Sequence, residues 1–103
     1  MKATEEILLQ TSDVRVRIMP LAVGSATVWH THSVISDHMV CLSGRIRVAL
    51  RQPEEIHDLA PGEWCRVPVG RPHRVVSLGD APSSYLLIQG VGAYDFNPIE
   101  HID

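Results

Sequence analysis

Apolar and polar residues alternate along most of the chain, in short runs that end at glycine or proline. In residues 14–19, valine or isoleucine occupies every second position, and arginine or methionine occupies the positions between them. A period of two places successive side chains on opposite faces of a β-strand, one toward a core and one toward water or a partner. The alternation predicts strands at 14–19, 26–32, 37–42, 45–50, 56–59, 64–67, 73–78 and 85–91.

The breaks between these runs have the residue types of turns. Ser43-Gly44 separates two runs, and a hairpin there is expected to pair residues 37–42 with residues 45–51. Pro61-Gly62 marks another turn, because proline presets φ and glycine permits positive φ. No stretch of ten residues shows a helical period. Many short, evenly spaced strands predict an all-β sandwich or barrel.

Length and composition indicate one globular domain over residues 1–103. A net charge of -3 argues against a nucleic-acid-binding surface, which usually carries a basic patch. No apolar run reaches the roughly 18 residues that span a bilayer. Glu5 and Glu6 stand where a signal peptide would need apolar residues, so a cytoplasmic location is expected. In that compartment Cys41 and Cys65 are expected to be buried thiols.

Three histidines and one aspartate form the candidate metal site. His30 and His32 are two residues apart, so a strand would point both imidazoles to the same side. Asp37 follows a bend expected at residues 33–36, and His73 lies on a separate run. Imidazole suits zinc, copper, iron and nickel, while oxygen ligands suit manganese. The other histidines, His38, His57 and His101, are interpreted as structural.

The spacing around the first two histidines resembles the first motif of the cupin superfamily. That motif is a glycine, five residues, H-x-H, three or four residues, a glutamate, six residues and a glycine. This chain has Gly24, His30, His32, Asp37 and Gly44 at those positions. Aspartate therefore replaces the glutamate and is one methylene shorter.

The region around His73 resembles the second cupin motif. That motif is a glycine, five residues, P-x-G, two residues, a histidine, three residues and an asparagine. Here Gly62, Pro68, Gly70 and His73 match, while Ser77 replaces the asparagine. The two motifs span residues 24–44 and 62–77, in the order that the family has.

The resemblance implies an antiparallel cupin β-barrel, a jelly roll also called a double-stranded β-helix. It implies one divalent ion at the barrel centre, which could be iron, zinc, nickel or manganese, held by His30, His32, Asp37 and His73. Asp37 is expected to bind the ion directly, to bind it through water, or to leave a three-histidine site with water. The residues expected to line the cavity, or to be plain core, are Met39, Cys41, Val48, Val75 and Gln89.

The resemblance also implies a small organic substrate or ligand that chelates the ion. A dioxygenase-, isomerase- or lyase-type enzyme is the first hypothesis, and a non-catalytic binding or sensor cupin is the alternative. A sensor usually carries an output domain, and this sequence shows none, which favours the enzyme. The alternation places no arginine or lysine clearly inside the barrel, and Arg66, Arg71 and Arg74 near the second motif are read as solvated.

A homodimer is a further expectation. A chain of 103 residues gains stability by burying a second apolar face. The apolar residues Val40, Leu42 and Val76 are expected to face outward and to be exposed in a monomer, which often marks an interface. Trp29 and Trp64 are interpreted as core or interface residues rather than as substrate contacts.

Overall fold

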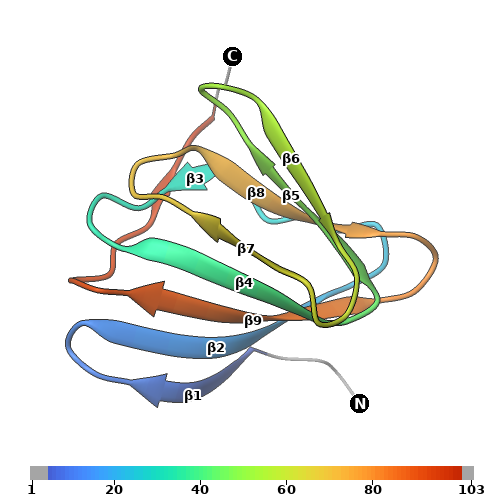
Figure 1. The fold of residues 1–103 in the computed structure, drawn as a ribbon, viewed down its shortest axis with the longest axis horizontal. Coiled ribbons are helices and arrows are strands. Elements are labelled where there is room, and N and C mark those ends of the chain that lie inside the picture. The colour runs from blue at the N-terminus through green and yellow to red at the C-terminus, as the bar shows by residue number, and fades with distance from the viewer. Residues whose placement is uncertain (1–4, 101–103) are drawn as a thin grey trace.

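Two antiparallel sheets of five strands each make up the fold (Figure 1). The computed structural model describes residues 5–100, and within that range it contains strands and no helix, so no helix there could cross a lipid bilayer. The strands are β1 (Glu6–Gln10), β2 (Val14–Leu21), β3 (His30–Thr31), β4 (Ser36–Ser43), β5 (Arg45–Leu50), β6 (Glu55–Leu59), β7 (Trp64–Val67), β8 (His73–Leu78), β9 (Ser83–Gly90) and β10 (Asn97–Pro98). One sheet has the order β1-β2-β9-β4-β7 and the other β10-β3-β8-β5-β6. The predicted all-β antiparallel fold is confirmed.

The strand prediction differs from the structure at three places. Residues 26–32 form a strand only at His30–Thr31, and Val28, expected on the face of the histidines, is 59% exposed. The strands β1 and β10 were not predicted. In β1 the apolar residues Ile7, Leu8 and Leu9 are consecutive and all exposed, so no period of two marks that strand. It is held instead by pairing with β2 at the sheet edge.

The hairpin expected at Ser43-Gly44 is wrong, because β4 and β5 lie in different sheets. β4 pairs with β9 and β7, whereas β5 pairs with β8 and β6. Gly44 has a φ of 67°, which lets the chain turn from one sheet to the other after a single residue. In Figure 1 the chain leaves the end of β4 and passes directly up into β5. This corner wraps the two sheets around one interior.

The interior is filled by side chains from both sheets. The buried apolar cluster consists of Leu21, Met39, Cys41, Ile46, Val48, Leu50, Leu59, Cys65, Val67, Val75, Tyr85 and Leu87. Both cysteines are buried and free, as expected. Burial raises the pKa of the Cys65 thiol to about 11, so Cys65 stays a neutral thiol at physiological pH.

On β2 the face that carries Arg17 points inward. Arg17 and Leu21 are buried, while the apolar residues Val16 and Ile18 are half-buried on the outer side. Across that outer side they pair with β9, Val16 opposite Ile88. The interior therefore receives the arginine of this strand, and the two apolar side chains remain half-buried outside.

The three residues expected to be exposed do not form one surface. Leu42 is 43% exposed, but Val40 and Val76 are only half-buried. Val40 lies on the outer side of the β1-β2-β9-β4-β7 sheet, and Val76 belongs to β8 in the other sheet, where it bridges Ala26. Trp64 is not a core residue, since it is 63% exposed on the outer side near Val40.

Candidate metal centre

Strand pairing brings two of the histidines face to face. His30 on β3 lies directly opposite His73 on β8, the only pair in the register of those strands. Their ring centroids are 4.2 Å apart, and both residues are buried. One antiparallel strand pair therefore brings His30 and His73 together, although they are far apart in the sequence.

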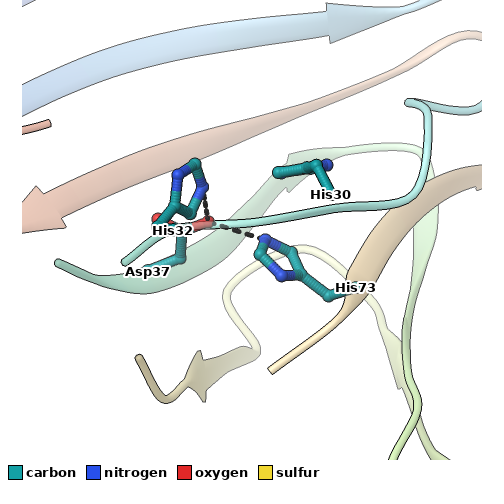
Figure 2. Close-up of side chains that lie close together, drawn as sticks. All are labelled: His30, His32, Asp37 and His73. Atoms are coloured by element: carbon teal, nitrogen blue, oxygen red, sulfur yellow. Dashed lines mark hydrogen bonds and ion pairs between the residues drawn. The ribbon is translucent and has the colours of Figure 1, made fainter. Parts of the chain in front are cut away.

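Asp37 and His32 complete the cluster from the other sheet and from the bend before it. Asp37 is buried on the inner side of β4, and its Oδ2 lies 3.0 Å from Nε2 of His73 and 3.2 Å from Nε2 of His32. Figure 2 shows the two contacts meeting at the same carboxylate oxygen. One ligand atom from each of the four residues lies within 4.8 Å of the other three. The four side chains could therefore hold a metal ion.

Backbone carbonyls fix the orientation of all three imidazole rings. Nδ1 of His30 donates to the Val28 carbonyl at 2.7 Å, and Nδ1 of His73 donates to the Arg71 carbonyl at 2.8 Å. His32 donates from Nδ1 to the carbonyl of Asp95. A carbonyl oxygen only accepts, so each Nδ1 carries the proton. In the neutral ring the lone pair is then on Nε2, which is how metal-binding histidines are usually held.

The cluster as a whole requires a positive charge. Nε2 of His32 is buried and makes no hydrogen bond, although it lies beside the Asp37 carboxylate. A carboxylate oxygen and the lone pairs of two neutral imidazoles would repel one another at about 3 Å, unless a proton or a metal ion lies between them. Ligands about 2.1 Å from an ion and at right angles to each other are themselves about 3 Å apart. The donor atoms and their spacing thus fit a divalent ion.

The pKa values of the cluster show which groups stay charged without an ion. Burial lowers the pKa of His30 to about 4, with help from neighbouring His73, so this imidazole is neutral at physiological pH. Burial opposes ionisation of Asp37 as well, but its contacts with His32 and His73 outweigh burial and hold its pKa below the usual range. The same contact outweighs burial at His32 and raises its pKa. An ionised carboxylate beside a neutral imidazole is a suitable ligand set for a cation.

A cavity of about 240 Å³ adjoins the cluster. Three of the five residues expected there, Met39, Val75 and Gln89, line it, whereas Cys41 and Val48 are core residues that do not. The space is equivalent to roughly eight molecules of liquid water, so it suits a small organic molecule.

The segment just before β10 lies against the cluster and was not predicted from the sequence. The Phe96 ring stacks on His30 with centroids 4.5 Å apart, and the Tyr94 ring lies 5.6 Å from His32. Asp95 supplies the carbonyl that orients His32, and its carboxylate accepts the backbone N–H of Ser33. Closely spaced aromatic residues near the end of the chain were the one sequence signal for this cover.

A buried arginine also reaches the cavity and contradicts the expectation that none does. Arg17 lines the cavity together with Glu5, and its guanidinium donates to Glu5 and to Gln89. Gln89 in turn donates from Nε2 to Oδ1 of Asp37 at 3.1 Å. The arginine is thus connected to the candidate metal site through one carboxamide. The alternation at residues 14–19 was a signal for this residue, but it does not say which face is inward.

The remaining predicted residues lie away from the cluster. His38 is on the outer side of β4 near Trp64, and His57 pairs with Glu55 at the surface. His101 lies outside the described residues. Trp29 is half-buried, and the guanidinium groups of Arg51 and Arg74 lie over its ring. Neither Arg74 nor Arg71 lines the cavity, and Arg66 is exposed.

Sequence comparison finds one family. The sequence model of the family described as "Cupin domain" matches residues 17–89, which include both motifs and all four residues of the cluster. No curated protein is similar enough in sequence to be matched.

Solved structures with the same fold are numerous. A protein of Klebsiella pneumoniae with a double-stranded β-helix domain has a TM-score of 0.82 and 19% identity, over 95% of this chain and 84% of that chain. KdgF from Halomonas has a TM-score of 0.75 and 21% identity, over 84% of this chain and 78% of that chain. An oxalate oxidase has a TM-score of 0.78 and 14% identity, over 84% of this chain but only 46% of that chain. At these identities the comparisons show the fold and no activity.

Proposed function

The chain belongs to the cupin family, and on that premise we propose that it is a small metal-dependent enzyme. His30, His32, Asp37 and His73 are the proposed ligands of one divalent ion, and a small organic molecule in the adjoining cavity is the proposed substrate. The reaction is of the dioxygenase, isomerase or lyase type. The observation that carries this proposal is the convergence of the Nε2 atoms of His32 and His73 on one buried carboxylate oxygen of Asp37, a position where a divalent ion would bind all three.

The cavity beside the four proposed ligands would place a substrate next to the ion. A bound divalent ion would supply Lewis-acid polarisation of a substrate oxygen, or dioxygen chemistry if the ion is iron. Phe96 and Tyr94 restrict the access of bulk water to the histidines. Gln89 occupies Oδ1 of Asp37, which leaves Oδ2 directed at His32 and His73.

Metal content tests the proposal. Untagged protein is dialysed against a chelator, offered Fe²⁺ without oxygen, Zn²⁺, Ni²⁺ or Mn²⁺, freed of excess ion and analysed by inductively coupled plasma mass spectrometry. We expect close to one equivalent of the preferred ion. The ion should also stabilise the fold by about 2.7 kcal/mol when its free concentration is about 100 times Kd.

The matched control is His57→Ala, which removes a surface histidine and should bind as much metal as the wild type. Retention below about a tenth of an equivalent for every ion would contradict the metal proposal, because a preformed ligand set should bind at least one of them. If metal binds but no turnover is found across substrate classes, the non-catalytic binding cupin becomes the better description.

A second copy of the chain is the proposed partner of the outer apolar side of the β1-β2-β9-β4-β7 sheet. Ile88, Val40 and Trp64 line one shallow surface there together with His38. An apolar surface of that kind on a small chain is stabilised when a second copy covers it. Size-exclusion chromatography with light scattering should give twice the mass of the 11.4 kDa chain. A single-chain mass at micromolar concentration would rule the dimer out.

A further inference from the structure

Arg17 is the one guanidinium that lines the cavity beside the candidate metal centre, among the residues that the structure describes. The Arg17 side chain is 9% exposed. Packing of the core alone would not require a charged residue at this buried position. Burial of a cation costs free energy unless the cation is paired. The hydrogen-bond partners of Arg17 therefore indicate its role.

The partners of Arg17 leave part of its hydrogen-bonding capacity open. One terminal nitrogen donates to Oε1 of Gln89 at 2.7 Å, inside the barrel. The other donates to Oε1 of Glu5 at 2.7 Å, and the Glu5 side chain is 43% exposed. Nε of Arg17 is buried and has no partner. A guanidinium presents five N–H donors as a planar fork that matches a carboxylate, and Arg17 still has donors that no acceptor uses.

Gln89 places the fork at a defined position relative to the candidate ion. Its oxygen accepts from Arg17 and its nitrogen donates to Oδ1 of Asp37, so the orientation of the amide is determined by its two partners. One carboxamide therefore separates the guanidinium from a proposed metal ligand. Arg17, His30 and Asp37 line the same 240 Å³ cavity, so a small molecule bound there would lie between the guanidinium and the cluster.

Glu5 already shows which chemical group this position takes. It belongs to the chain just before β1 and not to the barrel, yet its carboxylate enters the cavity lining and accepts from Arg17. The Glu5 side chain is 43% exposed, so its ion pair with Arg17 can open at little cost, whereas Arg17 and Gln89 are buried.

We propose that Arg17 binds the carboxylate of a small organic acid whose other oxygen donor faces the metal centre, and that Glu5 occupies the carboxylate position until the acid displaces it. This inference rests on the proposed function for the metal end of the acid. The anion end depends only on residues of the chain and is tested without metal. Among the described residues, Arg17 is the only arginine or lysine that lines the cavity. One guanidinium suits a monoanionic carboxylate better than a phosphate, which usually gathers several donors.

Acetate is the probe for the anion end. Metal-free, ¹⁵N-labelled protein is titrated with acetate at constant ionic strength, and the Arg17 and Gln89 side-chain signals are followed by NMR. We expect Glu5→Gln to bind acetate about 10-fold more tightly than the wild type, because an internal competing carboxylate is gone. Adding Arg17→Gln to Glu5→Gln should weaken acetate binding by about 10-fold or more, since a charged hydrogen bond is lost.

Controls separate this site from general charge effects. Arg47→Gln breaks the surface ion pair with Asp58 and should leave acetate binding unchanged. Acetamide, which lacks the charge, should not compete with acetate. Where Arg17→Gln fails to fold, Arg17→Lys replaces it and should bind acetate less tightly than the arginine, because lysine lacks the fork. Unchanged acetate affinity in Glu5→Gln, or phosphate binding more tightly than acetate, would overturn the inference.

Malonate tests the metal end with the zinc-loaded protein. Its two carboxylates can reach the ion and Arg17 together, so we expect it to bind more tightly than acetate; equal affinity would overturn the bridging arrangement. The two proposals fail separately. If zinc is not retained but acetate depends on Arg17, the metal proposal fails and the anion site stands. If zinc is retained and neither acid depends on Arg17, this inference fails and the metal centre stands.

Discussion

Replacement of His73 by alanine is expected to lower the affinity for the preferred divalent ion by at least about 100-fold. Loss of a group that merely orients a ligand costs roughly 10- to 100-fold in metal affinity, so loss of a ligand should cost more. His73 also lies 3.0 Å from Oδ2 of Asp37 and directly opposite His30. Its removal takes away one donor and leaves the carboxylate with one imidazole partner fewer.

The measurement is a competitive titration of metal-free protein with a chromophoric chelator, run on the wild type, His73→Ala and His57→Ala. His57→Ala removes a histidine that pairs with Glu55 at the surface, and it should match the wild type. Circular dichroism of the metal-free variants checks that each has folded. An affinity of His73→Ala within about threefold of the wild type would mean that the ion binds elsewhere, because no ligand loss is so small.

Replacement of Gly44 by alanine is expected to destabilise the fold by about 3 kcal/mol or more. A Cβ on Gly44 would lie 2.6 Å from the carbonyl oxygen of Pro82 and 2.9 Å from Cα of Ser83. Both are backbone atoms, so a rotation of a side chain cannot relieve the clash. A φ of 67° adds about 1–2 kcal/mol for any residue with a Cβ. Against a total of about 5–15 kcal/mol for a domain, this is a large loss.

Gly24→Ala is the matched control. Gly24 has a φ of 70°, close to that of Gly44, but a Cβ there would meet no atom within 4 Å. We expect Gly24→Ala to lower the free energy of unfolding by about 1–2 kcal/mol, which is the cost of the left-handed backbone conformation alone. Urea unfolding of the metal-free proteins gives both values, provided that the slope of the transition is unchanged. Equal losses for the two variants would show that the contact with the Pro82–Ser83 backbone is relieved by movement and that the corner is not tightly specified.

The fold and three of the four cluster residues follow from regularities that act over short distances in the sequence. A period of two is a direct consequence of strand geometry, so the strands from β4 to β9 could be placed from the alternation. The spacing around His30, His32 and His73 resembled two cupin motifs, and the structure gathers these residues into one buried cluster. Asp37 was left open, because a carboxylate one methylene shorter reaches the site only if the β4 backbone lies close enough.

Only the tertiary structure decided how these strands pair and what else reaches the site. The alternation of β2 is compatible with either face inward, and in the structure the face with Arg17 is inside while Val16 and Ile18 are half-buried on the outer side. The hydrogen bond from Arg17 to Gln89 joins residues that are 72 positions apart in the sequence. The hydrogen bond from His32 to the Asp95 carbonyl joins residues that are 63 positions apart. The corner at Gly44, which separates β4 from β5, likewise depends on the distant Pro82–Ser83 backbone. Such contacts depend on which distant strands pair and on how the two sheets pack, and a local pattern of side chains does not encode either.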